Sequence, residues 1–308
     1  MDLKQLKALV TVAEAGSVTK AAQLLHLVQP AVTRQIKTLE DELGVPLFER
    51  TRQGMRPTEA GAVLVERARR ALAELERARA EIRPDPGIVS GIATVGLLES
   101  TLDVLAVPLV QRLRERHPGI ELRLMTAYSG HLQQWLDDGD VDMSLLYNLR
   151  STPSLFVQPL LREQLWVVGP ADADLDPARP VPPTEICRHQ LVMPVAAHGL
   201  RVLIDQVFAR LKTAPTIAVE TNSMPLQKQF VHAGYGWTVL PAAGVAADIA
   251  AGRLAGAPIN DPEAIRDVVL GLPHTGRLPP AVEAVARELI VVAQKLVTSG
   301  AWPAARLD

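Results

Sequence analysis

The fold is decided by two N-terminal segments, Ser17-Val18-Thr19-Lys20-Ala21-Ala22-Gln23-Leu24-Leu25 and Gln29-Pro30-Ala31-Val32-Thr33-Arg34-Gln35-Ile36. Ser17 follows a glycine and is suited to cap a helix over the first segment. Pro30 suits the first turn of the next helix, and Gly44 is placed to end it as a C′ glycine. The sequence therefore predicts two short helices joined by a tight turn. A further helix precedes them, because Leu3, Leu6, Leu9, Val10 and Ala13 recur at helical spacing.

The helix predicted from Gln29 to about Leu43 has one apolar and one polar face. At 100° per residue its apolar side chains fall within one narrow arc, and the polar ones line up beside it. An amide, a hydroxyl and two cations are the groups that reach base edges and phosphates in a major groove. From this helix alone, an ordinary amphipathic surface helix explains the pattern equally well. The apolar arc contains Val32, Ile36, Leu39 and Leu43, and the polar side contains Gln29, Pro30, Thr33, Arg34 and Lys37.

The surrounding residues resemble the LysR-type family of transcriptional regulators. Besides the two segments above, the resemblance is carried by Leu39-Glu40, Leu43-Gly44-Val45-Pro46-Leu47-Phe48-Glu49-Arg50 and Pro57-Thr58-Glu59-Ala60-Gly61. It is dense over residues 1–61 and implies a winged helix-turn-helix DNA-binding domain over residues 1–57. The recognition helix would begin at Gln29, and the wing would run from Pro46 to Pro57. The DNA-binding residues that it implies are Gln29, Pro30, Thr33, Arg34, Lys37, Arg50, Arg52 and Arg56.

The sequence departs from the family pattern at Val28, where the family commonly has a serine that caps the recognition helix. Loss of such a cap costs about 1 kcal/mol. The departure puts the start of the helix and its phosphate contact in doubt, but not the fold. The wing arginines would supply affinity that depends on salt and little on sequence.

The bulk properties fit a cytoplasmic protein of more than one domain. The chain has 308 residues, and Cys187 is its single cysteine, so no intrachain disulfide can form. It contains no run of about 18 apolar residues, and its first residues lack the features of a secretory signal. We therefore expect a cytoplasmic protein without a membrane partner.

The charge is unevenly distributed along the chain. Residues 1–83 contain 14 Lys and Arg against 11 Asp and Glu, a formal charge of +3, whereas residues 84–308 contain 18 against 23, a charge of −5. A basic N-terminal segment favours nucleic acid as its partner. A difference this small is a mild indication, since it also arises by chance.

Residues 58–87 are expected to form a dimerisation helix and a hinge. A helix from Thr58 to about Arg83 has an apolar seam of the kind that pairs with another helix. Two prolines and a glycine in Pro84-Asp85-Pro86-Gly87 then end the helix. Symmetric pairing predicts a dimer that binds an interrupted inverted repeat of double-stranded DNA, and the family resemblance adds a tetramer as the alternative. The seam consists of Gly61, Leu64, Ala68, Ala71, Leu75, Ala78 and Ile82.

Residues 88–308 alternate between strand and helix patterns, which predicts a parallel α/β sheet. The resemblance implies an effector-binding domain of two lobes, similar to periplasmic binding proteins. Lobe I would contain about residues 88–162 and 267–308, and lobe II about residues 163–266. The whole chain is thus an α+β multidomain protein. The strands are expected at 91–96, 120–124, 141–146, 165–168, 191–193, 217–219, 237–240 and 268–270, and helices at 102–116, 131–137 and 280–296.

The effector pocket is expected between the lobes, at the carboxyl ends of the strands, where helix N-termini favour an anionic group. An organic acid is one candidate effector. Capping of a helix explains the serines and threonine equally well, and a hydrogen-bonded loop position is the simpler explanation for His198. The candidate effector-binding residues are Ser100, Thr101, Tyr128, Ser129, His198, Asn222 and Ser223.

Three classes of function remain open. The first is a regulator whose geometry on DNA is changed by an effector, and the second is a DNA-binding regulator whose α/β domain serves only oligomerisation. An enzyme is the third and the least supported, because the sequence has no nucleophile elbow, phosphate-binding glycine loop or metal-ligand spacing. We therefore expect no catalytic residues, no metal and no cofactor. Stretches such as Tyr128–Trp135 and Gly236–Pro241 resemble the nitrogen-assimilation-control branch of the family.

Overall fold

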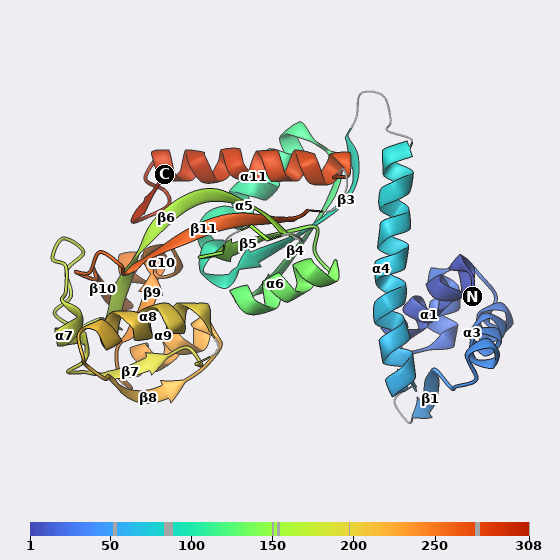
Figure 1. Ribbon diagram of the computed structural model, residues 1–308, viewed down its shortest axis with the longest axis horizontal. Helices are drawn as coiled ribbons and strands as arrows, with labels where there is room; N and C mark the ends of the chain where they lie inside the picture. The colour runs from blue at the N-terminus through green and yellow to red at the C-terminus, as the bar shows by residue number, and fades with distance from the viewer. Residues whose placement is uncertain are drawn as a thin grey trace. The chain divides into compact units, whose positions relative to one another are not determined.

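A computed structural model describes residues 1–51, 54–82, 89–149, 151–152, 155–196, 198–274 and 278–307 (Figure 1). The chain divides into two compact units, Met1–Pro84 and Asp85–Asp308. The predicted hinge at residues 84–87 lies outside the described residues.

The first unit begins with three helices, α1 (Leu3–Ala15), α2 (Val18–Leu24) and α3 (Gln29–Leu43). Their ends confirm the predicted signals, because Ser17 accepts a hydrogen bond from the backbone N–H of Lys20 and Gly44 ends α3 with a left-handed φ of 71°. Leu43 departs from the prediction: it is 42% exposed, because the last turn of α3 extends past the core. The core of this unit contains Leu6, Ala8, Leu9, Val12, Ala21, Ala22, Val32, Ile36, Leu39, Leu47, Phe48, Val65 and Ala68.

The wing is an antiparallel hairpin of β1 (Phe48–Thr51) and β2 (Gly54–Pro57). Its base is attached to α3 by Glu40, whose Oε1 accepts hydrogen bonds from the backbone N–H groups of Leu47 at 2.7 Å and Phe48 at 3.3 Å. A side chain of α3 thereby sets where the wing begins.

The long helix α4 (Glu59–Ile82) completes the first unit. Its beginning packs inside the unit, since Val65 and Ala68 are buried in the core. Gly61 lies so close to Leu47 that an added Cβ would be 1.9 Å from the Leu47 carbonyl oxygen. Gly61 and Ala68 of the predicted seam thus pack inside the first unit. Further along the helix, Leu75 is 41% exposed, so a large part of this apolar side chain is accessible.

The second unit is built on an eight-stranded mixed sheet with the central order β10-β6-β11-β5-β3-β4. Strand β3 pairs in parallel with β4 and β5, as predicted, whereas β5–β11, β11–β6, β6–β10 and β6–β9 are antiparallel. The prediction of a parallel sheet is therefore wrong for the strands that pair with β6 and β11. Long strands rather than helical crossovers connect the two halves of the sheet there. The bounds are β3 (Ser90–Leu98), β4 (Gly119–Ala127), β5 (Met143–Tyr147), β6 (Leu155–Pro170), β9 (Thr238–Pro241), β10 (Leu254–Pro258), β11 (Ile265–Pro273) and β12 (Ala305–Arg306), which also pairs with β6.

Helices cover this sheet, and two separate hydrophobic cores result. In the first core α5 (Leu102–Arg116) packs against α11 (Pro280–Thr298), and α6 (Ser129–Asp138) packs on the opposite side of the strands (Figure 1). The second core lies among β6, β9, β10 and the small parallel pair β7 (Gln190–Met193) and β8 (Thr216–Glu220). Its helices are α7 (Pro183–Ile186), α8 (Gly199–Arg210), α9 (Met224–His232) and α10 (Ala246–Ala250).

Strand β6 runs through both cores without interruption. Leu160 and Leu161 belong to the first core, and Leu165 and Val167 belong to the second. Its partner β11 starts beside residues 163 and 164, since Arg266 faces Glu163 and Ile265 faces Gln164. The two strands that connect the cores therefore bring Glu163 and Arg266 together at the boundary between them.

Candidate functional site

The polar face of α3 is open to solvent, whereas Val32, Ile36 and Leu39 of the same helix are buried. Gln29 and Thr33 lie one turn apart and are joined, since the Gln29 side-chain amide donates to Thr33 Oγ1 at 3.3 Å. Val28 precedes the helix, is 71% exposed and provides no side-chain cap, as the sequence predicts. The exposed side chains are Gln29, Pro30, Thr33, Arg34 and Lys37.

The wing presents its two described arginines on opposite faces. Arg50 lies opposite Met55 and Arg56 lies opposite Glu49, so alternation along the strands separates the two guanidinium groups. Arg52, which was predicted to contact DNA, lies outside the described residues. Within the part of the chain that the structure describes, Arg34, Lys37, Arg50 and Arg56 form no ion pairs. These exposed cations are therefore available to phosphates.

A pocket of about 390 Å³, part of it open to solvent, lies between the two cores of the second unit. It is located where β3, β4 and β5 end and where α8 and α9 begin, which is the usual place for a ligand in an α/β sheet. Its lining combines apolar side chains with a few polar groups, as ligand pockets commonly do. The lining residues are Leu98, Glu99, Ser100, Tyr128, Tyr147, His198, Leu200, Asn222, Met224, Gln227, Leu240, Pro241 and Arg266.

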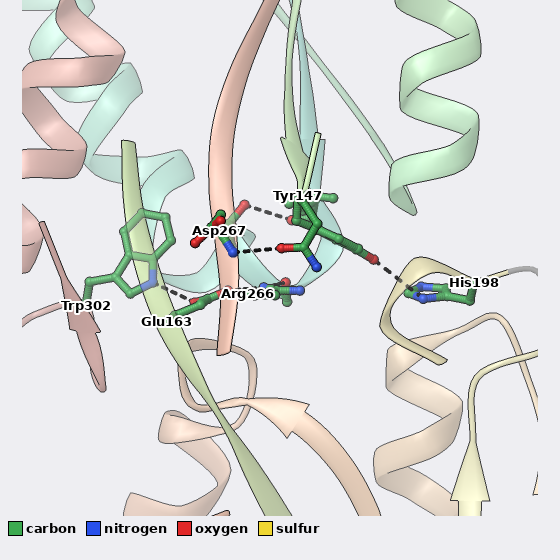
Figure 2. A network of polar contacts seen from close by, with 10 residues as sticks. Tyr147, Glu163, His198, Arg266, Asp267 and Trp302 are labelled. Atoms are coloured by element: carbon green, nitrogen blue, oxygen red, sulfur yellow. Dashed lines mark hydrogen bonds and ion pairs between the residues drawn. The ribbon is translucent and has the colours of Figure 1, made fainter. Parts of the chain in front are cut away.

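Arg266 is the buried cation of this pocket and is held on two sides. Its guanidinium forms an ion pair with Glu163, and its Nη2 donates to Ser100 Oγ at 2.6 Å. Glu163 in turn accepts a hydrogen bond from Trp302 Nε1 at 3.0 Å (Figure 2). The guanidinium also lies over the ring of Tyr147, 4.8 Å from its centroid. Among the described residues, none accepts a hydrogen bond from Nη1 of Arg266.

His198 faces Arg266 across the pocket as a neutral imidazole. The backbone N–H of Leu200 donates to its Nδ1 at 3.1 Å, so the proton of the neutral ring is on Nε2. The hydroxyl of Tyr147 lies 3.5 Å from the same nitrogen (Figure 2). Burial, together with the charge of Arg266, lowers the pKa of His198 to about 4. Burial raises the pKa of Tyr147, which keeps its hydroxyl protonated and able to donate.

Acidification from pH 7 to pH 5 is expected to destabilise the protein through His198. Its pKa is about 4 when folded and 6.5 in a model peptide. The unfolded chain therefore binds a proton that the folded chain does not, and stability falls as the pH drops below 6.5. At pH 5 the loss is about 2 kcal/mol.

The matched variant is His198→Asn. Asparagine can still cap α8, but its side chain does not titrate. Urea unfolding at both pH values should show a smaller loss of stability for this variant than for the natural protein. Carboxylates with lowered pKa values, such as those of Asp248 and Glu288, change the stability of the protein mainly at lower pH, where they become protonated. Equal losses in the two proteins would contradict the prediction.

A further polar contact joins the two sides of the pocket. Glu99 lies in the short 3₁₀ turn Glu99–Thr101 after β3, and its Oε2 accepts a hydrogen bond from the backbone N–H of Met224 at 3.0 Å. Met224 is the first residue of α9. A carboxylate from one side of the pocket therefore interacts with the N-terminus of a helix on the other side, where a negative charge is favoured.

The structure brings some of the predicted effector-binding residues into the pocket and leaves others outside its lining. Ser100, Tyr128, His198 and Asn222 line it. Thr101 is fully buried and donates to the Leu98 carbonyl oxygen at 2.8 Å, and Ser223 caps α9. Ser129 is buried in the first turn of α6. The lining residues that the sequence analysis missed include Glu99, Tyr147, Gln227 and Arg266.

Cys187 is half-buried and is not bonded to another cysteine. The described residues contain no cluster of histidine, cysteine and carboxylate side chains that could hold a metal ion. None of the described helices is both long and apolar enough to cross a lipid bilayer.

Comparison with known proteins assigns the chain to a family. Residues 87–293 match the model of the LysR substrate binding domain, and residues 3–62 match that of the bacterial regulatory helix-turn-helix protein, lysR family. The chain belongs to the LysR family. It is accordingly a DNA-binding transcriptional regulator with an effector-binding domain, and the resemblance found in the sequence is confirmed.

The relatives of this LysR-family protein are bacterial transcriptional regulators. It is 35% identical to the regulator CbbR of Xanthobacter flavus over 92% of this chain and 85% of the relative. It is 30% identical to the nitrogen assimilation regulatory protein nac of Klebsiella aerogenes over 94% of both chains. The full-length LysR-family regulator CbnR in complex with its target DNA has a TM-score of 0.70 at 22% identity, covering 95% of this chain and all of that chain. This last likeness supports the fold, and LysR regulators bind DNA, effectors and further copies of themselves.

Proposed function

We propose that this regulator senses a small molecule with an anionic group, which binds beside Arg266 in the pocket of the second unit. The observation that carries the proposal is the buried guanidinium of Arg266, whose Nη1 has no acceptor among the described residues. Ser100, Tyr128, His198 and Asn222 surround the same space and supply further hydrogen-bonding groups. We infer that the protein acts by binding alone, in the cytoplasm.

The DNA is contacted, in this proposal, by residues 1–57. The exposed face of α3 would lie in a major groove, with Gln29, Thr33 and Arg34 toward the bases and Lys37 toward a phosphate. Arg50 and Arg56 of the wing would contact the sugar-phosphate backbone. Because Arg50 and Arg56 lie on opposite faces of the hairpin, we expect them to contact two different stretches of the DNA backbone.

Residues 58–87 would pair two chains, and residues 88–308 would sense the effector. The exposed Leu75 of α4 supports a paired helix, because a large apolar side chain there would be covered by a partner. A symmetric dimer would bind an interrupted inverted repeat. Because the pocket lies where β6 and β11 connect two cores, its occupancy would change the angle between the cores and so the spacing of the two DNA-binding units.

Asn222→Asp is expected to weaken binding of an anionic effector at least tenfold. Asn222 is exposed and lines the pocket, so the substitution places a negative charge beside the ligand without disturbing a core. A thermal-shift screen of the full-length protein against carboxylates and phosphorylated metabolites would identify a ligand, and calorimetry would measure its dissociation constant. Asn260→Asp makes the same chemical change at an exposed position outside the pocket and should leave binding unchanged.

The same ligand then tests the coupling to DNA. Its addition should change the length of the protected region in a footprint on an operator selected from random sequence. An unchanged footprint would contradict the proposed re-spacing, and absence of any ligand would favour a regulator whose α/β domain serves only oligomerisation.

A further inference from the structure

Glu99 places a carboxylate in the same pocket as Arg266. Only one of its oxygens is engaged: Oε2 accepts from the Met224 backbone N–H, and Oε1 contacts no polar group among the described residues. The pocket therefore contains one free acceptor on an acid and one free donor, Nη1, on a base. Arg266 already forms an ion pair with Glu163, whereas Glu99 has no cationic partner among the described residues.

The two groups are close together. Nη2 of Arg266 donates to Ser100 at 2.6 Å, and Ser100 follows Glu99 directly in the 3₁₀ turn. Glu99 and Arg266 both belong to the lining of the one pocket. A small molecule that fills this pocket of about 390 Å³ would therefore meet both groups.

The charges around the pocket do not suit a simple anion. Arg266 is neutralised by its ion pair with Glu163, which is fully buried, and His198 is neutral. Glu99 adds a negative charge that no described cation balances. The formal charges thus comprise one positive and two negative groups, and a ligand with only an anionic group would meet repulsion from Glu99.

We propose that the effector is a small dipolar molecule, such as an α-amino acid, whose carboxylate binds Arg266 and whose ammonium group binds Glu99. This proposal rests on the proposed function and specifies the chemical class of the ligand. The rings of Tyr128 and Tyr147 suit the same ligand, because aromatic faces attract cations. An ammonium group at Glu99 would also act on the contact with Met224 that joins the two sides of the pocket.

The test compares L-α-amino acids with the 2-hydroxy acids that carry the same side chains. Suitable pairs are alanine and lactate, phenylalanine and 3-phenyllactate, and glutamate and 2-hydroxyglutarate. In each pair a hydroxyl replaces the ammonium group, so the comparison isolates the contribution of that group. Calorimetry with the full-length protein at pH 7 should show an amino acid that binds at least tenfold more tightly than its hydroxy acid.

Glu99→Gln provides the second arm of the test. Glutamine keeps an oxygen that can accept from Met224, so the contact across the pocket is retained, while the charge is removed. The variant should bind the amino acid at least tenfold more weakly and the hydroxy acid no more weakly than the natural protein. Glu115→Gln, at an exposed position of α5, is the matched control and should change neither.

The outcomes separate this inference from the proposed function. Equal binding of amino and hydroxy acids, or an amino acid that binds Glu99→Gln undiminished, overturns the dipolar ligand and leaves the proposed function standing. Binding of other carboxylates but of no amino acid has the same meaning. If no compound binds in either screen, the dipolar ligand and the proposed function are both overturned.

Discussion

Glu163→Gln should lower the free energy of unfolding of the second unit by about 3–5 kcal/mol, because it leaves a buried charge without its partner. Glu163 is fully buried, and Arg266 is only 2% exposed. Glutamine has nearly the same shape as glutamate but cannot neutralise the guanidinium. The only compensation open to the variant is to admit water or to rotate Arg266 away from β6, and either change would disturb the boundary between the two cores.

Two controls separate the charge from the packing. Glu121→Gln makes the same change in the exposed pair of Glu121 with Arg123 and should cost less than about 1 kcal/mol. Trp302→Phe keeps an aromatic ring in the core but removes the hydrogen bond to Glu163, so a loss of about 1–3 kcal/mol is expected.

Tryptophan fluorescence during urea unfolding would measure these losses, since all four tryptophans of the chain lie in the second unit. A Glu163→Gln protein within 1 kcal/mol of the natural one would mean that Arg266 is solvated in the pocket. Its buried position would then not require Glu163.

Local signals explain why much of the fold could be predicted from the sequence. Ser17 caps α2 and Gly44 ends α3 through hydrogen bonds and dihedral angles that involve only a few neighbouring residues. The helix α5 was predicted with its observed bounds, Leu102–Arg116, because its apolar residues recur at helical spacing. Glu40, noticed only through the family resemblance, has a physical role: it attaches the wing to α3.

The pocket and four of its polar residues could be located from the sequence, but its charged groups, Glu99 and Arg266, could not. Ser100 and Arg266 are 166 positions apart, and Glu163 and Arg266 are 103 apart. Neither separation leaves a periodic signal. Ser100 and Thr101 are equivalent candidates in the sequence, and only the turn after β3 decides that one faces Arg266 while the other bonds back to Leu98.

The antiparallel strands were missed for a related reason. A strand of 16 residues such as β6 shows the same apolar alternation whichever way its neighbours run. Its partners β10 and β11 come about 100 residues later, so the direction of pairing is a long-range property. The expectation of helical crossovers was correct for β3, β4 and β5 and for the small pair β7 and β8.

Arg34→Ala is expected to weaken binding to a selected operator at least tenfold for each half-site. Arg34 is exposed on α3 and makes no ion pair with the described residues, so its guanidinium is free to donate to DNA. A good contact to a base edge contributes about 1–3 kcal/mol of discrimination. Its exposure means that the substitution should leave the stability of the first unit unchanged, which urea unfolding would verify.

Arg34→Lys distinguishes the two kinds of contact that an arginine makes. Lysine keeps the charge but loses the planar pair of donors, so it should rescue a phosphate contact and fail to rescue a bidentate contact to guanine. Affinities for the operator and for scrambled DNA, measured over a range of salt concentrations, separate these cases. If Arg34 contacts a base, both variants lose operator affinity and keep affinity for scrambled DNA.

Arg50→Ala in the wing should instead weaken binding to both DNAs equally and lower the salt dependence of binding by about one ion per contact. Unchanged operator affinity of Arg34→Ala would contradict the assignment of α3 as the recognition helix, because this cation lies at the middle of its exposed face.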